Sequence, residues 1–406
     1  MQDADPSSQA SAVIDRRSGA GVDARAAPLP AQLPALLPDA RLAAWLRLER
    51  TRGVGPRSAA GLLAAFGTPE AIFVAGHEAL AAQAGPALAR ALLQGPSADT
   101  ERLIEATLRW REAPGQQVVA LGEPGYPELL AQIPDPPLLL YIKGRAGLLA
   151  GPCLAIVGSR NASRQGQENA QAFAAALSGA GLGIVSGLAL GIDAAAHEGA
   201  LAGPGSTIAV VGTGPDLVYP VRNRLLAERI VAKGCIASEY PIGMPPLPGN
   251  FPKRNRIISG LSAGVLVVEA AARSGSLITA RQAAEQGRDV FAIPGSIHAA
   301  LAKGCHALIR EGAKLVDSAQ DVLEALALAP LAGLRAQAVA APAPAAAIPE
   351  DGLLAALGHG PVAPDVLLAA LGGNAGELSA QLLMLELAGR LERLPGGLVQ
   401  RVVKPS

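Results

Sequence analysis

The 406-residue sequence predicts an α/β fold with a parallel-sheet core, and two observations support this. First, the segments "PCLAIV", "GIVSG", "STIAVVGTG" and "GVLVVEA" contain apolar runs without polar alternation, which is typical of strands covered on both faces. Second, polar turns and helical patterns separate these runs. Strands that alternate with helices in this way form parallel sheets. We therefore expect an extended Rossmann-like core over residues 113–326.

The N-terminal third predicts a tail and a helical domain. Residues 1–38 are rich in Ala, Pro, Ser and charge and lack a continuous apolar segment, so we expect a disordered tail and not a signal peptide. Residues 39–112 have helical patterns, and Gly53–Gly55 forms a hairpin between two of these helices. This helix-hairpin-helix-like (SAM-like) pattern can hold a backbone phosphate on its turn amides, or it can be a packing module that binds nothing.

The C-terminal part predicts a linker and a winged-helix domain. Residues 327–350 are rich in Ala and Pro, which is typical of a semi-extended linker. Residues 351–406 show three short helices and then a hairpin that turns at "PGG". The predicted recognition helix "AGELSAQLLMLELAG" has no Lys or Arg. Because gripping duplex DNA requires phosphate neutralisation, we expect this domain to contact protein or nothing.

Composition narrows the possible roles. Cys153, Cys235 and Cys305 are far apart and form no CxxC pair, so neither a zinc site nor a disulfide framework is expected, and a reducing cytoplasm is indicated. No apolar run is long and charge-free enough to span a bilayer, so we expect no membrane partner.

The formal net charge of zero hides a basic middle segment. Residues 153–315 carry 15 Lys and Arg against 10 Asp and Glu. Residues 1–152 carry 14 against 15, and residues 316–406 carry 5 against 9. The segment "NFPKRNRIIS" (residues 250–259) places Lys253, Arg254 and Arg256 within four positions. This cluster predicts an anionic partner, and Phe251 beside it offers a face on which a base can stack.

Small polar turns follow four of the predicted strands, at residues 158–160, 186–191, 212–214 and 269–276. The carboxyl ends of parallel strands meet at one edge of a sheet. Small residues there let a ligand approach helix N-termini, whose free amides favour phosphate. One such turn alone would indicate only a tight connection. Four turns, together with Arg160 and the basic stretch, predict a phosphate-binding groove.

Other chemistries receive less support from the sequence. No lysine precedes Ser or Thr, so there is no Walker A loop, and no GxGxxG follows a strand. The GxSxG match at residues 260–264 precedes a strand, which is the wrong context for a nucleophile elbow. Asp193 and His197 lie on one helix face and could form half a metal site or an acid/base pair, but no third ligand is evident. We favour a structural role, in which Asp193 caps the helix and local hydrogen bonds hold His197. Glu269 either is catalytic or anchors a neighbouring turn. We predict no catalytic residue, metal or cofactor.

The segments "AIVGSR", "SGLALGIDAAAH", "GTGPDLVYP", "SEYPIGMPPLPGNFPKRNRIISGLS" and "SGSLITARQAAEQGRDVFAIPG" occur in one order within this core. Together they closely resemble the DNA-processing protein A family (DprA, also called Smf) over residues 120–316. The resemblance implies a bacterial cytoplasmic homodimer that binds and protects single-stranded DNA and loads the recombinase RecA during natural transformation. It implies no established enzymatic activity. The DNA-binding residues that it and the turn pattern indicate are Ser159, Arg160, Gly187, Gly191, Phe251, Lys253, Arg254, Asn255 and Arg256.

We therefore predict a sequence-independent single-stranded DNA binder. The alternative is a Rossmann-like enzyme that binds nucleotides or hydrolyses nucleoside monophosphates. Its phosphate loop resembles PGGxGTxxE, whereas residues 269–280 read "EAAARSGSLITA", which lacks that loop. A third hypothesis is a protein-interaction scaffold, which the acidic winged helix favours but which leaves the basic cluster unexplained.

Overall fold

The computed structural model describes residues 36–326 and, further along, residues 353, 357, 362–371, 374–388, 390–394 and 397–401. Chain contacts divide the molecule into two units, Met1–Ala329 and Pro330–Ser406. Residues 1–35 of the predicted tail and the predicted linker at 327–350 lie outside the described residues. The predicted boundary between the helical domain and the core stays a prediction.

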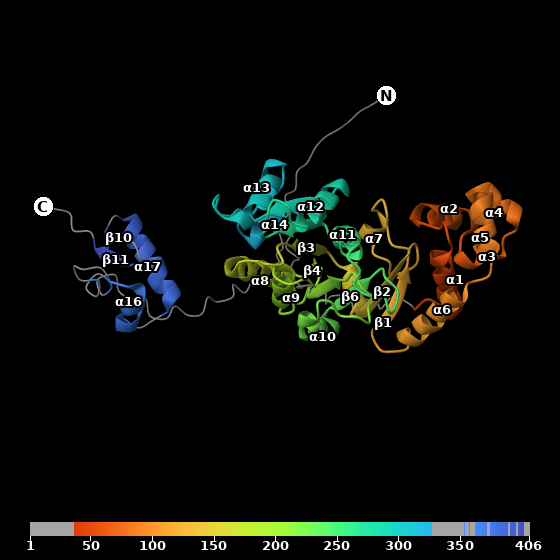
Figure 1. Ribbon diagram of the computed structural model, residues 1–406, viewed down its shortest axis with the longest axis horizontal. Helices are drawn as coiled ribbons and strands as arrows, with labels where there is room; N and C mark the ends of the chain where they lie inside the picture. The colour runs from red at the N-terminus through yellow and green to blue at the C-terminus, as the bar shows by residue number, and fades with distance from the viewer. Residues whose placement is uncertain are drawn as a thin grey trace, which may run out of the picture. The chain divides into compact units, whose positions relative to one another are not determined.

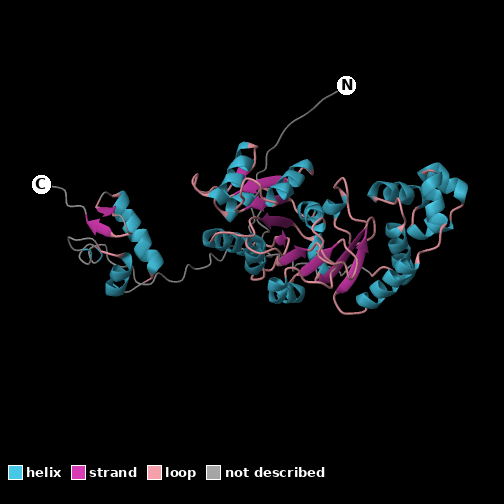
Figure 2. Cartoon of the chain, in the orientation of Figure 1, coloured by secondary structure: helices cyan, strands magenta, loops and turns pink. Residues whose placement is uncertain are grey.

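Within residues 36–326, nine strands form one sheet in the order β1-β2-β6-β5-β4-β3-β7-β8-β9 (Figures 1 and 2). The strands from β6 to β9 are mutually parallel, which confirms the predicted parallel core. Strand β2, in the segment "PLLLYIKG", runs antiparallel to both β1 and β6. The sequence analysis did not predict β1. The strands are β1 Gln116–Ala120, β2 Leu139–Gly144, β3 Cys153–Val157, β4 Gly183–Ser186, β5 Thr207–Val210, β6 Cys235–Ser238, β7 Gly264–Val267, β8 Asp289–Ala292 and β9 Lys314–Leu315.

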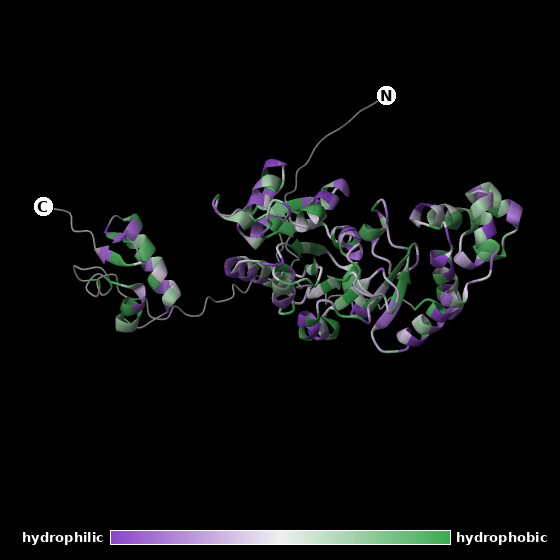
Figure 3. Ribbon diagram, in the orientation of Figure 1, coloured by the Kyte–Doolittle hydropathy of each residue, from purple (hydrophilic) through white to green (hydrophobic). Residues whose placement is uncertain are grey.

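The central strand β3 shows why these apolar runs form a covered sheet. Its Ala155 pairs with Val185 of β4 and with Val265 of β7. Successive residues of a strand point to opposite faces. Accordingly, Ala155 belongs to one buried cluster, while Leu154 and Ile156 belong to another. Figure 3 shows hydrophobic residues concentrated on the core strands, while the helices carry both kinds of residue.

Helices cover both faces of the sheet. The cluster that contains Ala155 also takes side chains from α11, α12 and α13, whereas the opposite cluster takes them from α8, α9 and α14. The helical segments of the core are α7 Glu128–Ala131, η1 Ala146–Ala150, α8 Arg164–Gly179, α9 Ile192–Ala200, η2 Val221–Asn223, α10 Arg224–Lys233, α11 Asn250–Gly260, α12 Ser276–Glu285, η3 Ala300–Ala302, α13 Lys303–Arg310 and α14 Ala319–Ala325.

The N-terminal helices pack directly on the sheet. Trp45 is almost fully buried in a cluster that also contains Val118 of β1 and Tyr141 of β2. The predicted hairpin lies between α1 and α2, where Gly53 has a φ of 89° that glycine adopts readily. The predicted helical domain is thereby confirmed. Its helices are α1 Asp39–Arg50, α2 Pro56–Phe66, α3 Pro69–Val74, α4 His77–Ala84, α5 Pro86–Leu93 and α6 Ala98–Arg111.

The second unit has the predicted winged-helix elements. Helices α16 (Pro364–Leu371) and α17 (Ala375–Leu387) precede an antiparallel hairpin of β10 (Leu391–Arg393) and β11 (Val399–Arg401). Leucines from both helices and the hairpin form its core. Most of the first predicted helix lies outside the described residues. Among the described residues no single helix could cross a membrane, and only the bent pair α16 and α17, taken together, reaches that length and composition.

Candidate nucleic-acid interface

A cavity of about 680 Å³ opens at the carboxyl ends of the parallel strands, where the sequence predicts a groove. We call it the core groove. It is lined by the last residue of β3 and the turn after it (residues 157–161), by side chains around the start of α11, and by residues 271, 274–276, 278 and 279. Of the predicted site residues, the structure places Ser159, Arg160, Phe251, Arg254 and Asn255 in its lining. Lys253 and Arg256 line an adjoining cavity, and Gly187 and Gly191 lie behind the groove wall.

The turn after β3 is held by backbone contacts, which leave Arg160 exposed. Ser159 donates its amide to the Glu269 carbonyl at 2.8 Å, and its own carbonyl accepts from the Ile192 amide at 3.2 Å. Within residues 36–326, the Arg160 side chain forms no hydrogen bond or ion pair. A cation without a protein partner at the carboxyl edge of the sheet can pair with a phosphate.

Gly187 and Gly191 are needed for close packing. A Cβ on Gly191 would lie 2.3 Å from the Ser159 carbonyl oxygen, so this glycine lets two turns touch. Its φ of 76° also favours glycine. A Cβ on Gly187 would lie 2.2 Å from the Arg254 guanidinium. Both glycines shape the wall of the core groove.

The amides of the turn after β4 are used inside the protein. Asp193 accepts the amides of Gly187 and Ala189 at 3.1 and 3.3 Å, and His197 Nε2 accepts the Leu188 amide at 3.2 Å. These three N–H groups are therefore not available to a phosphate. The local hydrogen bonding predicted for His197 is confirmed, but the helix cap predicted for Asp193 is wrong, because the N-cap of α9 is Gly191 and Asp193 bonds the preceding turn.

The protonation of His197 follows from its partners. Its Nδ1 lies 2.7 Å from the Thr207 hydroxyl, which itself donates to the Ile184 carbonyl. Nδ1 therefore carries the hydrogen, and Nε2 accepts. Burial lowers the pKa of His197 to about 3, with Arg254 contributing. Burial also raises the pKa of Asp193, although nearby Arg254 opposes this shift.

The basic stretch lies on a helix, and only one of its three cations is exposed. The stretch forms α11, which begins at Asn250, and the Asn250 side-chain amide donates to the Gly212 carbonyl at 3.0 Å. Neighbouring helical residues point about 100° apart, so adjacent cations face different surroundings. Lys253 is exposed and Arg254 is buried, while Arg256 is partly buried.

Arg254 and Arg256 are paired within the protein. Arg254 Nη1 donates to the carbonyls of Gly187 and Val210, which ties α11 to the ends of β4 and β5. Arg256 forms a two-pronged ion pair with Glu239, at 2.8 and 2.6 Å. In the described part of the chain, Lys253 has no side-chain partner. Sequence spacing alone does not distinguish these three cations.

Two aromatic residues, Phe251 and Tyr219, lie at the core groove, and the sequence analysis identified only Phe251. Phe251 and Tyr219 have ring centroids 5.4 Å apart with their planes tilted by 40°. Tyr219 lines the groove and is 47% exposed. The available signal was its position in "GTGPDLVYP", directly after a strand, in a chain with few aromatic residues.

Glu269 anchors a turn. Its carboxylate accepts the Ser163 amide at 2.9 Å and the Ser163 hydroxyl at 2.5 Å. Ser163 in turn caps α8. In the described residues, no three His, Cys, Asp or Glu side chains gather where they could hold a metal ion. The arrangement presents exposed cations and aromatic faces, which are the chemistry of a polyanion site.

A Rossmann-like core with such a groove, joined to a helix-hairpin-helix region and a winged helix, defines a class of nucleic-acid-binding proteins. Family comparison agrees with this class. The DNA recombination-mediator protein A family matches residues 117–327, the DprA winged helix domain matches residues 337–397, and the DprA-like N-terminal HHH domain matches residues 39–92. The chain belongs to the DNA recombination-mediator protein A (DprA) family, and the resemblance seen in the sequence is confirmed.

Curated relatives and a solved structure support this membership. The chain is 43% identical to Protein Smf of Escherichia coli over 301 residues, which cover 73% of this chain and 80% of the relative. It is 54% identical to DNA processing protein DprA of Streptococcus pneumoniae over 198 residues, or 49% of this chain and 70% of the relative. The crystal structure of the Streptococcus pneumoniae protein matches with a TM-score of 0.59 and 40% identity, covering 71% of this chain and 98% of that one.

Proposed function

We propose that this protein binds single-stranded DNA without regard to sequence, in the core groove. The observation that carries the proposal is the exposed set, which is Arg160 and Tyr219 in the lining of the core groove and Lys253 in the adjoining cavity. The Arg160 and Lys253 side chains have no partner within residues 36–326. Two cations can neutralise phosphates, and an exposed aromatic ring can stack on a base. A duplex keeps its bases stacked on one another, so stacking on Tyr219 favours an unpaired strand.

The predicted site residues have two kinds of role in this proposal. Arg160 and Lys253 pair with phosphates, while Ser159 and Asn255 offer polar groups from the groove wall. Phe251 supports Tyr219. Gly187, Gly191, Arg254 and Arg256 hold the wall in shape.

The surroundings of the acidic and imidazole groups near the groove support a protein that binds DNA without catalysing a reaction. Asp193, His197 and Glu269 all have internal hydrogen-bond partners and satisfy the backbone near the groove. We therefore propose no catalytic residue. Family membership further supports a role in DNA processing, for which we propose delivery of the bound strand to the recombinase RecA in the cytoplasm during natural transformation, by a homodimer. Two linked sites would bind one strand more tightly than a single site does.

The exposed face of α17 supports a different role for the winged-helix unit. Leu383, Met384 and Leu387 are 49%, 68% and 76% exposed. No Lys or Arg occurs between Ala375 and Leu387. Such a face offers nothing to a phosphate backbone, so we propose that this unit does not grip DNA.

Fluorescence anisotropy of labelled oligo-dT tests the proposal. We expect tight binding that weakens with salt, and weaker binding by the double variant Arg160→Ala/Lys253→Ala. The matched control is Arg164→Ala/Arg229→Ala, which removes two exposed cations that form ion pairs elsewhere. If both double variants bind like the wild type, the core groove is not the site, and nucleoside monophosphates would then be tested for binding and turnover.

A further inference from the structure

A second cavity, of about 590 Å³, lies between the N-terminal helices and the core. We call it the hairpin cavity, because Val54, Gly55 and Pro56 of the hairpin turn form one wall. Leu138 and Ile278 line it from the core side. Ile278 and Pro252 line the core groove as well, so the two cavities adjoin. A strand that lies in the core groove can therefore continue into the hairpin cavity.

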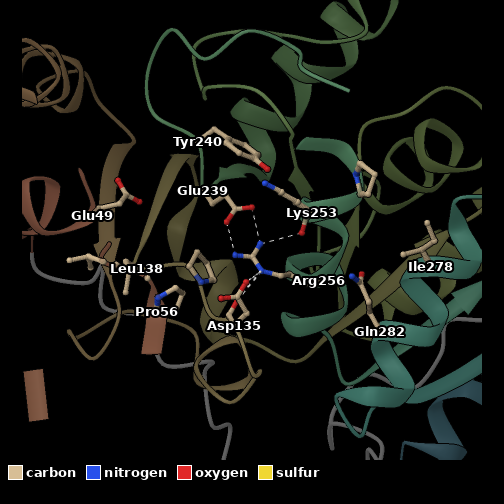
Figure 4. Close-up of a pocket in the computed structure, with 14 residues that line it drawn as sticks. Glu49, Pro56, Asp135, Leu138, Glu239, Tyr240, Lys253, Arg256, Ile278 and Gln282 are labelled. Atoms are coloured by element: carbon tan, nitrogen blue, oxygen red, sulfur yellow. Dashed lines mark hydrogen bonds and ion pairs between the residues drawn. The ribbon is translucent and has the colours of Figure 1, made fainter. Parts of the chain in front are cut away.

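Most of the charge in the hairpin cavity is already paired. Arg256 forms its ion pair with Glu239, and its Nε donates to the Asp135 carbonyl at 2.9 Å (Figure 4). This leaves Glu49 and Lys253, whose side chains form no hydrogen bond or ion pair within residues 36–326. The Arg256 cluster closes one side of the cavity, and the two remaining groups are free to meet a ligand.

Glu49 and Gln282 offer matching polar groups from opposite walls. Burial raises the pKa of Glu49 to about 8, against the effect of Arg50, and this favours the protonated carboxyl, which both donates and accepts. Gln282 Oε1 is buried, and within the described residues no group donates to it. The Gln282 side chain forms no hydrogen bond within residues 36–326, so its amide nitrogen is the group that remains to donate to a ligand. Figure 4 shows Glu49 and Gln282 on either side of the Arg256 cluster.

The Val54 and Gly55 amides of the hairpin turn already have hydrogen-bond acceptors and are not available to a phosphate. The Gly55 amide donates to the Ser58 hydroxyl at 2.8 Å, and the Val54 amide donates to the Thr51 carbonyl at 3.0 Å. The phosphate mode, which the sequence analysis left open beside a packing module that binds nothing, needs free amides, and neither of these two is free. The cavity instead combines apolar walls with two donor–acceptor groups, which favours a flat group with polar edges over an anion.

We propose that the hairpin cavity binds one nucleobase of the same single strand, with Lys253 on the phosphate that precedes the base. A base has two apolar faces and an edge that both donates and accepts hydrogen bonds. Glu49 can meet that edge in any base, and Gln282 on the opposite wall can donate to an oxygen of the attached sugar, so these contacts add affinity without sequence preference. This inference rests on the proposed single-stranded DNA binding and extends its site to the N-terminal helices.

Binding of labelled oligo-dT to the full chain tests the inference. Glu49→Leu and Gln282→Leu should each weaken binding about tenfold, which is the size of one modest base contact. Glu49→Gln should bind like the wild type, because an amide also donates and accepts. The matched control is Glu78→Leu, which replaces an exposed carboxylate on α4 of the same helical region. Thermal unfolding of each variant separates loss of binding from loss of fold.

Photocrosslinking supplies a readout that does not depend on affinity. Oligo-dT that carries 4-thiothymidine should form adducts with residues 49–57 as well as with the core groove. Adducts confined to the core groove, or Glu49→Leu binding as well as or better than the wild type, would overturn the inference. If those results came with weak binding by Arg160→Ala/Lys253→Ala, the proposed function would stand and only the base site would fail. If the wild type did not bind oligo-dT, both would fail.

Discussion

Around the core groove, one set of groups is exposed and another is buried, and both contain cations that look alike in the sequence. The exposed set is Arg160 and Tyr219 in the groove lining and Lys253 in the adjoining cavity. The buried set is Arg254 with Asp193 and His197, which together bond the turn after β4. The difference shows that neighbouring cations of one basic cluster can have different roles. One cation builds the groove wall, and its neighbour on the same helix remains available to a ligand.

The largest effect expected from this comparison is on stability. Arg254→Ala would leave the buried carbonyls of Gly187 and Val210 without a donor and Asp193 without a nearby cation. We expect the free energy of unfolding to fall by about 3–5 kcal/mol, measured by urea denaturation. Lys253→Ala, the control on the same helix, should change it by about 0.5 kcal/mol or less. A stable Arg254→Ala protein that no longer binds DNA would make Arg254 a ligand instead.

The second prediction concerns pH. Because the pKa of His197 is lowered to about 3 in the folded protein and is about 6.5 in the unfolded chain, the unfolded chain takes up the proton first. Stability from this group is present above about pH 6.5 and is lost as the pH falls toward 3. By pH 4.5 the loss should reach about 2–3 kcal/mol. Urea denaturation between pH 7 and 4.5 should show a shallower pH dependence for His197→Gln, and an unchanged slope would contradict this account.

The third prediction concerns the aromatic member of the exposed set. Tyr219→Ala should weaken oligo-dT binding by about 1–2 kcal/mol through loss of base stacking, with little change in its salt dependence. Anisotropy at two salt concentrations measures both quantities. Tyr219→Phe serves as the control and should bind like the wild type. Equal losses in the Phe and Ala variants would assign the effect to the hydroxyl and not to stacking.

The smallest effect is expected from the second unit. Removal of residues 330–406 should change oligo-dT affinity by about twofold or less, because the exposed face of α17 has no cation for a phosphate. The two units are separate in chain contacts, so the first unit should keep its fold. The measurement is anisotropy with single-stranded and duplex probes. A large loss of affinity for either probe would show that the winged-helix unit contributes to DNA binding.

Sequence patterns were sufficient to predict the elements whose residues all lie in the same environment. The apolar runs predicted the parallel strands, because a strand covered on both faces needs apolar side chains at every position. The antiparallel β1 was not predicted, since only its pairing with β2 places "QQVVA" in the sheet. Within the site, the burial of Arg254 and the pairing of Arg256 with Glu239 depend on contacts distant in sequence. Tyr219 was missed for the same reason, because Phe251 meets it only in the folded chain.

The most direct test of the central claim is the salt dependence of oligo-dT binding by Arg160→Ala, Lys253→Ala and their double variant. Each removed phosphate contact should reduce the slope of log affinity against log salt by about 0.7, so the double variant should lose about 1.4. The control Arg164→Ala/Arg229→Ala should keep the wild-type slope. An unchanged slope in the double variant would contradict the claim that these two exposed cations hold the strand.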